Sequence, residues 1–199
     1  MIGQLRGRLL DKQPPQLLLD VAGVGYELEA PMSTIYALSA DGGEIRLFTH
    51  MVVRDDALLL YGFATQDERQ LFRELIRVSG VGPKLALTIL SGISVADFVA
   101  TIDANDAARL TGLPGIGKKT AARLTMEMRD RLQDSSLAAL TVAPAAAAAP
   151  AAAGTVGEAR HALVALGYKP QEAARLLKNI DASLDSEAMI REALKRAIR

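Results

Sequence analysis

The sequence contains no cysteine among its 199 residues. Disulfides, thiolate metal sites and a cysteine nucleophile are therefore excluded, and the composition fits a reducing compartment. Aromatic residues are also scarce, at 4% of the chain. An enzyme that flips bases out of DNA needs aromatic walls around its pocket, so this scarcity disfavours that class.

Long hydrophobic runs are missing as well. The N-terminal stretch MIGQLRGRLL has no apolar core long enough for a signal peptide. No run apart from an Ala/Pro tract approaches the ~18 apolar residues of a membrane-spanning helix, and that tract is too weakly apolar to span a bilayer. We therefore expect a cytoplasmic protein with no membrane partner.

The net charge is zero, from 23 Lys and Arg and 23 Asp and Glu. Its distribution is uneven, because residues 1–63 hold 5 basic and 8 acidic residues (−3) and residues 64–133 hold 10 and 8 (+2). Nucleic acid would therefore be held by individually placed groups and not by bulk charge.

Residues 1–63 have the pattern of a small β-barrel. Apolar runs suited to strands recur at 2–10, 17–29, 44–53 and 57–63, with Gly, Pro and Asp between them. About five short strands in so few residues favour a closed barrel. An OB-type barrel fits the size, but the strand number alone does not select it over other small barrels.

Residues 64–133 change to a helical apolar period. Pro83 stands at the expected first position of a helix. Ser94, with an acid three residues later, and Asn105 are predicted to cap the next two helices.

Residues 134–156 form a predicted flexible linker. Pro144 and Pro150 interrupt a run of alanines that has almost no charge or bulk. Residues 157–199 then carry three short amphipathic helical patterns. The chain is thus predicted to be an α+β multidomain protein with a barrel, a helical domain, a linker and a three-helix C-terminal domain.

The stretch TGLPGIGKKT is similar to a phosphate-binding P-loop, G-x-x-x-x-G-K-[ST]. Gly112, Gly117 and Lys118 fit that spacing. Lys119 stands where a Ser or Thr hydroxyl would hold magnesium, and Thr120 comes one place late. A P-loop also follows a buried strand, whereas the preceding NDAARLTGL is short and polar. We therefore disfavour an ATP site.

A second copy of the motif favours another way of binding phosphate. SGVGPKLAL and PGIGKKTAA align 35 residues apart, each between two helical segments. A Gly-apolar-Gly turn allows close backbone approach, and its N–H groups with the following helix N-terminus can bind a phosphate oxygen. The candidate DNA-binding residues are Gly80, Val81, Gly82, Lys84, Gly115, Ile116, Gly117, Lys118, Lys119, Thr120 and Arg123.

The simpler alternative is that each motif is only a tight turn between helices. Duplication with a following lysine in both copies disfavours it. Val81 and Ile116 are expected to anchor the two turns in the local core, and the lysines to add positive charge. Such a grip contacts the nucleic-acid backbone and does not discriminate base sequence.

Stretches along essentially the whole chain resemble the RuvA family, whose members are the DNA-binding subunits of the bacterial Holliday junction branch migration complex. The resemblance implies an OB-fold barrel, a tandem helix–hairpin–helix domain, a mobile linker and a C-terminal three-helix domain similar to ubiquitin-associated domains. It rests on MIGQLRG, GVGYE, FTHMVVRDDALLLYGF, ELIRVSGVGPKLALTILSG, LPGIGKKTAARL and ALVALGYKPQEA.

The resemblance also implies partners. These are four-way junction DNA, the hexameric AAA+ ATPase RuvB, the junction resolvase RuvC, and further copies of the chain in a homotetramer, two of which sandwich a junction as an octamer. Because RuvB hydrolyses the ATP, we expect this chain to have no catalytic residue, no cofactor and no metal, and to stimulate the partner ATPase. The implied setting is DNA recombination, repair and the SOS response to DNA damage.

Arg54-Asp55-Asp56 lies between the last two expected strands. Phosphate repels adjacent carboxylates at close range. The resemblance implies that Asp55 and Asp56, with Arg54 adjacent, form an acidic pin at the tetramer centre that keeps the crossover open. The family commonly has Glu-Asp there, so this pair has a shorter reach. A solvated β-turn is the plain alternative, and a magnesium nuclease site would need further carboxylates.

The C-terminal domain has two interpretations. Leu163, Leu166, Tyr168, Ala174 and Leu177 fit a small hydrophobic core. The resemblance implies that part of this apolar surface binds the motor, and we assign that role to Leu163, Leu166 and Tyr168.

The sequence leaves two other classes of function as alternatives. A helix–hairpin–helix glycosylase would need a catalytic acid after the second hairpin, and Asp130 is the nearest, although we expect it to pair with neighbouring arginines. A pure protein-interaction adaptor would not need duplicated phosphate hairpins. His50 and His161 have no ligand at metal spacing and are expected to be structural or exposed.

Overall fold

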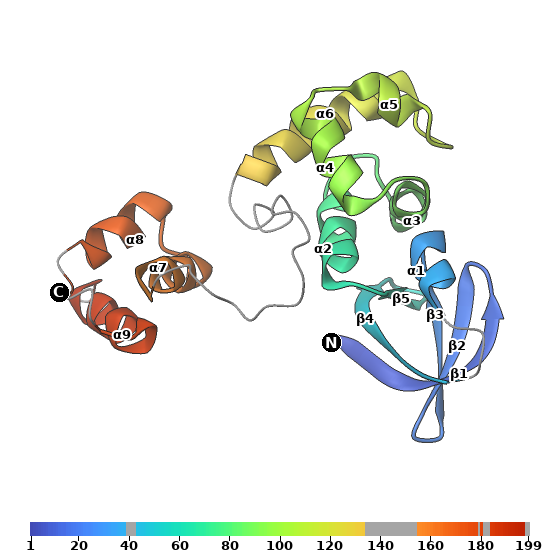
Figure 1. Cartoon of the computed structure of the whole chain (residues 1–199), viewed down its shortest axis with the longest axis horizontal. Coiled ribbons are helices and arrows are strands. Elements are labelled where there is room, and N and C mark those ends of the chain that lie inside the picture. Colours follow the sequence, from blue (N-terminus) through green and yellow to red (C-terminus); the bar gives the residue numbers. More distant parts are fainter. Residues whose placement is uncertain (39–42, 134–154, 179, 181–183, 198–199) are drawn as a thin grey trace. The chain divides into compact units, whose positions relative to one another are not determined.

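The computed structural model describes residues 1–38, 43–133, 155–178, 180 and 184–197. The chain divides into two compact units, Met1–Ala143 and Pro144–Arg199 (Figure 1). The elements of the first unit are β1 (Gln4–Gln13), β2 (Gln16–Val21), β3 (Val24–Glu29), α1 (Met32–Ala37), β4 (Glu44–Val53), β5 (Leu58–Phe63), α2 (Gln66–Leu75), α3 (Pro83–Gly92), α4 (Val95–Asp103), α5 (Ala107–Thr111) and α6 (Lys118–Gln133).

Within residues 1–38 and 43–133, five strands close into a barrel in the order β1-β2-β3-β5-β4. Neighbouring strands are antiparallel, except that β3 and β5 pair in parallel at Glu29 and Tyr61. This is the topology of an OB-fold, so that prediction is confirmed. Alternate side chains fill the barrel, and Gly7 takes an inward position where any Cβ would collide with the carbonyl oxygen of Asp20.

The last strand of the barrel also belongs to the core of the helical half. The ring of Phe72 on α2 lies 5.0 Å from that of Tyr61 and 4.9 Å from that of Phe63, centroid to centroid. All three residues are buried in one cluster with the apolar residues of α3, α4 and α6. The barrel and the helices therefore share a core and form a single unit.

A buried carboxylate fixes the joint between them. Glu68 forms a capping box with Thr65 at the start of α2. Its carboxylate also accepts hydrogen bonds from the hydroxyls of Ser33 (2.5 Å) and Thr34 (2.9 Å) on α1, and from the N–H of Ala64 (3.1 Å). Glu68 is only 9% exposed. The helix that leaves the barrel is thus tied back to it.

Most predicted helix starts are confirmed, and one is wrong. Pro83 is the first residue of α3, and Ser94 caps α4 by accepting from the N–H of Asp97. Asn105 does not cap α5. Asp106 does, by accepting from the Arg109 N–H at 3.0 Å, while Asn105 adopts the left-handed conformation that asparagine tolerates, with φ of 54°.

The second unit contains α7 (Thr155–Ala165), α8 (Pro170–Leu177) and α9 (Ser186–Ala197). Three helices in the described part of this unit agree with the predicted pattern. Residues 134–154 of the predicted linker lie outside the described residues, and the first two residues of α7 are the last two of that linker. The core of the unit consists of Ala159, Leu163, Ala173, Leu177, Met189 and Ala193.

No single helix in the described ranges is long and apolar enough to cross a membrane. The consecutive helices α3 and α4 reach the length and composition only when taken together, and they are bent by 96° at the break between them.

Replacing the joint carboxylate should destabilise the first unit. We expect Glu68→Ala to lower its free energy of unfolding by about 2–3 kcal/mol, because α2 loses the side-chain half of its capping box and buried donors lose their acceptor. Urea unfolding followed by circular dichroism measures this. The control is Asp67→Ala, which removes the neighbouring exposed carboxylate of the same helical turn and should change stability by less than about 0.5 kcal/mol. Equal losses in the two variants would contradict the role of Glu68.

Candidate nucleic-acid interface

The two hairpins repeat the same backbone hydrogen bonds 35 residues apart. In each, one N–H···O bond closes the turn and a second begins the following helix. The duplication expected from the sequence is therefore present in the backbone. The bonds run from Val81 N to Val78 O (3.0 Å) and Ala86 N to Gly82 O (3.0 Å) in the first hairpin, and from Ile116 N to Leu113 O (3.2 Å) and Ala121 N to Gly117 O (2.9 Å) in the second.

The residue types of the turns follow from their geometry. Gly80 and Gly115 have φ of 85° and 78°, the left-handed region where a side chain is strained. Val81 and Ile116 are 4% and 5% exposed and pack in the shared core, as expected for anchors. These two residues therefore position the turns from inside and do not present their side chains to a ligand.

The helix N-termini behind the turns are open. Gly82 is the N-cap of α3 and provides no side-chain cap. The N–H groups of Lys84 and Leu85 donate to no acceptor among the described residues, and the first turn of α6 is open in the same way. Pro83 has no N–H, whereas Lys118 at the equivalent position has one. The second hairpin thus offers one donor more for an anion.

The basic residues at the hairpins fall into two groups. Lys84, Lys118 and Lys119 are exposed, and none of them forms an ion pair within the described ranges. Arg123 differs, because its Nη1 donates to the carbonyl oxygen (3.0 Å) and hydroxyl (3.3 Å) of Ser79. It therefore links the helix of the second hairpin to the turn of the first.

The acidic pair lies at the tip of the β4–β5 hairpin. The N–H of Arg54 donates to the carbonyl oxygen of Ala57 at 2.9 Å and closes the tip. Asp55 and Asp56 are exposed and have no hydrogen-bond or ion-pair partner in the described part of the chain. Among the described residues, no three His, Asp or Glu side chains gather as metal ligands would.

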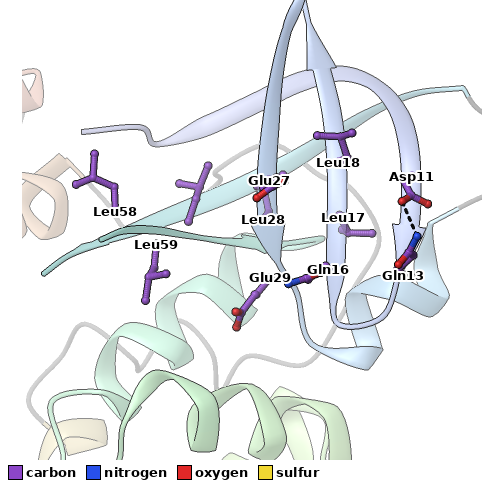
Figure 2. A pocket seen from close by; sticks show the side chains of 11 residues that line it. Asp11, Gln13, Gln16, Leu17, Leu18, Glu27, Leu28, Glu29, Leu58 and Leu59 are labelled. Carbon is purple, nitrogen blue, oxygen red and sulfur yellow. Dashed lines mark hydrogen bonds between the residues drawn. The ribbon is translucent and has the colours of Figure 1, made fainter. Parts of the chain in front are cut away.

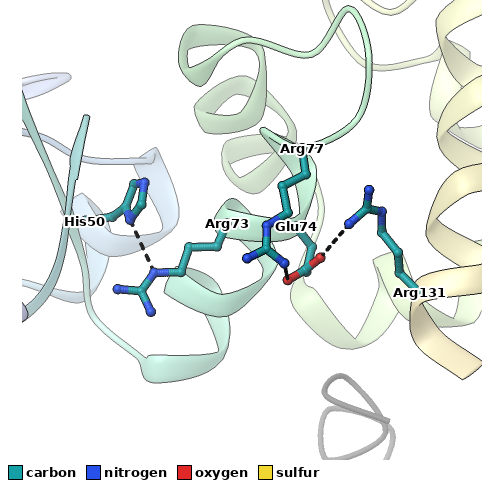
Figure 3. A network of polar contacts seen from close by, with 5 residues as sticks. All are labelled: His50, Arg73, Glu74, Arg77 and Arg131. Atoms are coloured by element: carbon teal, nitrogen blue, oxygen red, sulfur yellow. Dashed lines mark hydrogen bonds and ion pairs between the residues drawn. The ribbon is translucent and has the colours of Figure 1, made fainter. Parts of the chain in front are cut away.

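Arg69 and Arg73, four residues apart on α2, form an arginine row, and Arg73 points toward His50 of the barrel (Figure 3). His50 on β4 accepts a hydrogen bond at its Nδ1 from Nε of Arg73 (3.3 Å). Burial, and then the charges of Arg73, Arg69 and Arg77, lower the pKa of His50, so the imidazole is a neutral acceptor. The sequence predictions omitted this row, although its four-residue spacing is visible.

The side chain of His161 lies outside the described residues.

The expected pairing of Asp130 with neighbouring arginines is wrong. Arg131 reaches the Glu74 carboxylate on α2 instead, at 3.1 Å, and shares it with Arg77 at 2.8 Å (Figure 3). Asp130 is exposed and forms no ion pair within the described residues, and the pocket beside it has no aromatic residue in its lining. It lacks the surroundings of a glycosylase acid.

The three residues predicted to bind a partner differ in exposure. Leu163 is fully buried in the core of the second unit, so it is unavailable to a partner in this conformation. Leu166 is 60% exposed, and Tyr168 is half-buried against the core. Ala174 is exposed, and the core position belongs to Ala173 next to it.

Three family models match the chain. That of the RuvA N terminal domain matches residues 1–62, that of the SAM-like helix-hairpin-helix tandem matches residues 72–130, and that of the RuvA C-terminal domain matches residues 155–197. Together they cover both units.

Curated relatives match over their full length. Proteins named Holliday junction branch migration complex subunit RuvA are 57% identical in Nitrosococcus oceani, 56% in Methylococcus capsulatus and 55% in Thioalkalivibrio sulfidiphilus. Each alignment covers 100% of this chain and 100% of the relative.

Removing the lysines of the second hairpin should weaken binding to any DNA. We expect Lys118→Ala with Lys119→Ala to reduce the slope of log affinity against log salt by about 2, because about two fewer phosphates are neutralised. Fluorescence anisotropy over a salt series measures the slope. The matched control, Lys169→Ala with Lys178→Ala on the second unit, should leave it unchanged. An unaltered slope in the hairpin variant would refute the assignment.

Proposed function

The chain belongs to the RuvA family, and from this premise we propose that it binds four-way (Holliday) DNA junctions and holds them open for branch migration in recombination and repair. The observation that carries this function is the duplicated hairpin with two open helix N-termini. Backbone amides and lysines grip phosphates without discriminating bases. That property suits a junction whose sequence changes as its branch point moves.

The assembly follows from the shape of the ligand. A junction has four equivalent arms, and one chain offers one pair of hairpins, so four copies in a homotetramer hold one arm each. A second tetramer on the opposite face makes an octamer. In the tetramer the tips with Asp55 and Asp56 gather at the crossover, where their charge repels phosphate and keeps the strands apart.

The motor function belongs to partners in this proposal. The chain supplies no ATP hydrolysis of its own, and it recruits and stimulates the hexameric ATPase RuvB through the second unit. Leu166 is the exposed apolar contact, Tyr168 borders it, and Leu163 shapes the surface from inside. RuvC, the resolvase, acts on the same open junction in the cytoplasm.

The domain division belongs to the same proposal. Residues 1–63 form the barrel with the pin, and residues 64–133 bind DNA. Residues 134–156 link this first part to residues 157–199, which bind the motor. A tether of this length leaves the motor-binding unit free to follow its partner while the hairpins stay on the DNA.

Preference among DNA shapes tests the function directly. The purified chain is titrated without ATP, at near-physiological salt and with excess competitor duplex, onto a single strand, a duplex and a four-way junction of equal length. We expect the junction to bind at least about tenfold more tightly than the duplex, because only it engages four copies at once. Equal affinities would leave generic phosphate binding and remove the support for the junction role.

The acidic tip should affect migration more than binding. We expect Asp55→Asn with Asp56→Asn to bind junctions as tightly as the natural chain or more tightly, since repulsion of phosphate is removed. Branch migration with RuvB should change in the same preparation. The control is Asp103→Asn, which removes an exposed carboxylate away from the tip. A weaker junction complex, or unchanged migration, would speak against the pin.

A further inference from the structure

An acidic groove lies on the barrel beside the β4–β5 hairpin (Figure 2). It has a volume of about 260 Å³ and is formed by β1, β2, β3 and β5. Asp11, Glu27 and Glu29 line it together with leucines, and its lining contains no Lys or Arg. The side chains of Glu27 and Glu29 have no hydrogen-bond or ion-pair partner in the described part of the chain. Leu58, at its edge, is 70% exposed.

The arginine row of Arg69 and Arg73 on α2 lies next to β4, and Arg46 on β4 lies beside it. Arg69 and Arg46 each lie 5.3 Å from the ring centroid of Phe48. Arg46, Arg69 and Arg73 have no carboxylate within ion-pair distance among the described residues. Burial and the neighbouring charges of Arg69 and Arg77 lower the pKa of Arg73. The isolated chain therefore holds like charges close together, and an anionic partner would offset the repulsion between them.

The two surfaces match in spacing as well as in charge. Glu27 and Glu29 come from one strand, β3, and alternate residues on one side of a strand are about 7 Å apart. Arg69 and Arg73 are four residues apart on α2, a rise of about 6 Å. Two ion pairs can therefore form side by side between these surfaces.

We propose that the acidic groove of one copy receives the arginine row of the next copy, as the repeating contact of the ring. This inference rests on the proposed homotetramer and assigns its interface. A contact between two different surfaces of identical chains is head-to-tail, and it closes into a ring when the rotation between copies divides a full turn. The groove and the row flank the β4–β5 hairpin, so successive copies bring their acidic tips together.

A second copy fits the row better than nucleic acid does. The groove carboxylates of Glu27 and Glu29 are also unpaired among the described residues, and DNA would leave them so, whereas one contact between copies satisfies both surfaces. The exposed Leu58 needs an apolar cover, which Phe48 and the aliphatic stems of the arginines provide. Desolvation of these apolar groups adds a stabilising contribution that an exposed ion pair lacks.

Charge reversal on each surface tests the contact. The groove variant carries Glu27→Lys with Glu29→Lys, and the row variant carries Arg69→Glu with Arg73→Glu. In each, the groove and the row have the same sign, so we expect native mass spectrometry without DNA to show loss of the tetramer. Mixing the two variants in equal amounts should restore it, because each groove then meets a row of opposite charge in an alternating ring.

Matched controls reverse the same number of charges on the second unit. Glu158→Lys with Glu172→Lys and Arg160→Glu with Arg175→Glu should remain tetrameric. Circular dichroism establishes that every variant is folded. Arg69 and Arg73 also donate to the carbonyl oxygen of Gly3 and to His50. Arg46→Glu, which breaks no hydrogen bond of the described residues, therefore replaces the row variant if that variant unfolds.

The outcomes separate the inference from the proposed function. Tetramers in both folded variants, or no tetramer in their mixture, would overturn the contact. A row variant that stays tetrameric but loses junction binding would also overturn it and would assign the row to DNA. If the variants behave as expected but the natural tetramer shows no preference for junctions, the contact stands and the junction function fails.

Discussion

The buried carboxylate of Glu68 is the interaction on which the relation between barrel and hairpins depends. It accepts hydrogen bonds from Ser33 and Thr34 on α1 and begins α2 through its capping box. The same helix packs Phe72 against the last strand and carries Arg69 and Arg73, the second of which donates to His50 on β4. The direction in which α2 leaves the barrel therefore determines where the first hairpin, the shared core and the basic surface lie.

The two hairpins share their turn residues and their open helix N-termini, and they differ in two of the residues around the turns. The glycines and the buried anchors recur 35 residues apart, and both helix N-termini are open. The first hairpin loses one donor to Pro83, and its turn is held by Arg123 from the second. Arg123 thus ties the two hairpins together, and this contact helps to fix the separation of their two open helix N-termini.

Local patterns predict much of this structure, and long-range contacts account for most of what they miss. Strand alternation, the duplicated Gly-apolar-Gly turn and the Pro83 start depend on neighbouring residues, so the sequence reveals them. The Arg131–Glu74 pair joins residues 57 apart, which no spacing rule connects. Asn105 and Asp106 are both good caps, and only the fold decides between them. The capping box of Thr65 and Glu68 joins residues three apart, whereas the α1 hydroxyls that also donate to Glu68 are 34 and 35 residues away from it.

The open amides of the hairpins have a consequence for the conditions under which the grip works. A backbone N–H does not titrate in the physiological range. A phosphate held by these groups keeps the same hydrogen bonds when the acidity of its surroundings changes. A grip built from imidazoles would lose its charge near neutrality. The backbone part of the proposed phosphate contact is thus insensitive to acidity, while ionic strength weakens the contact.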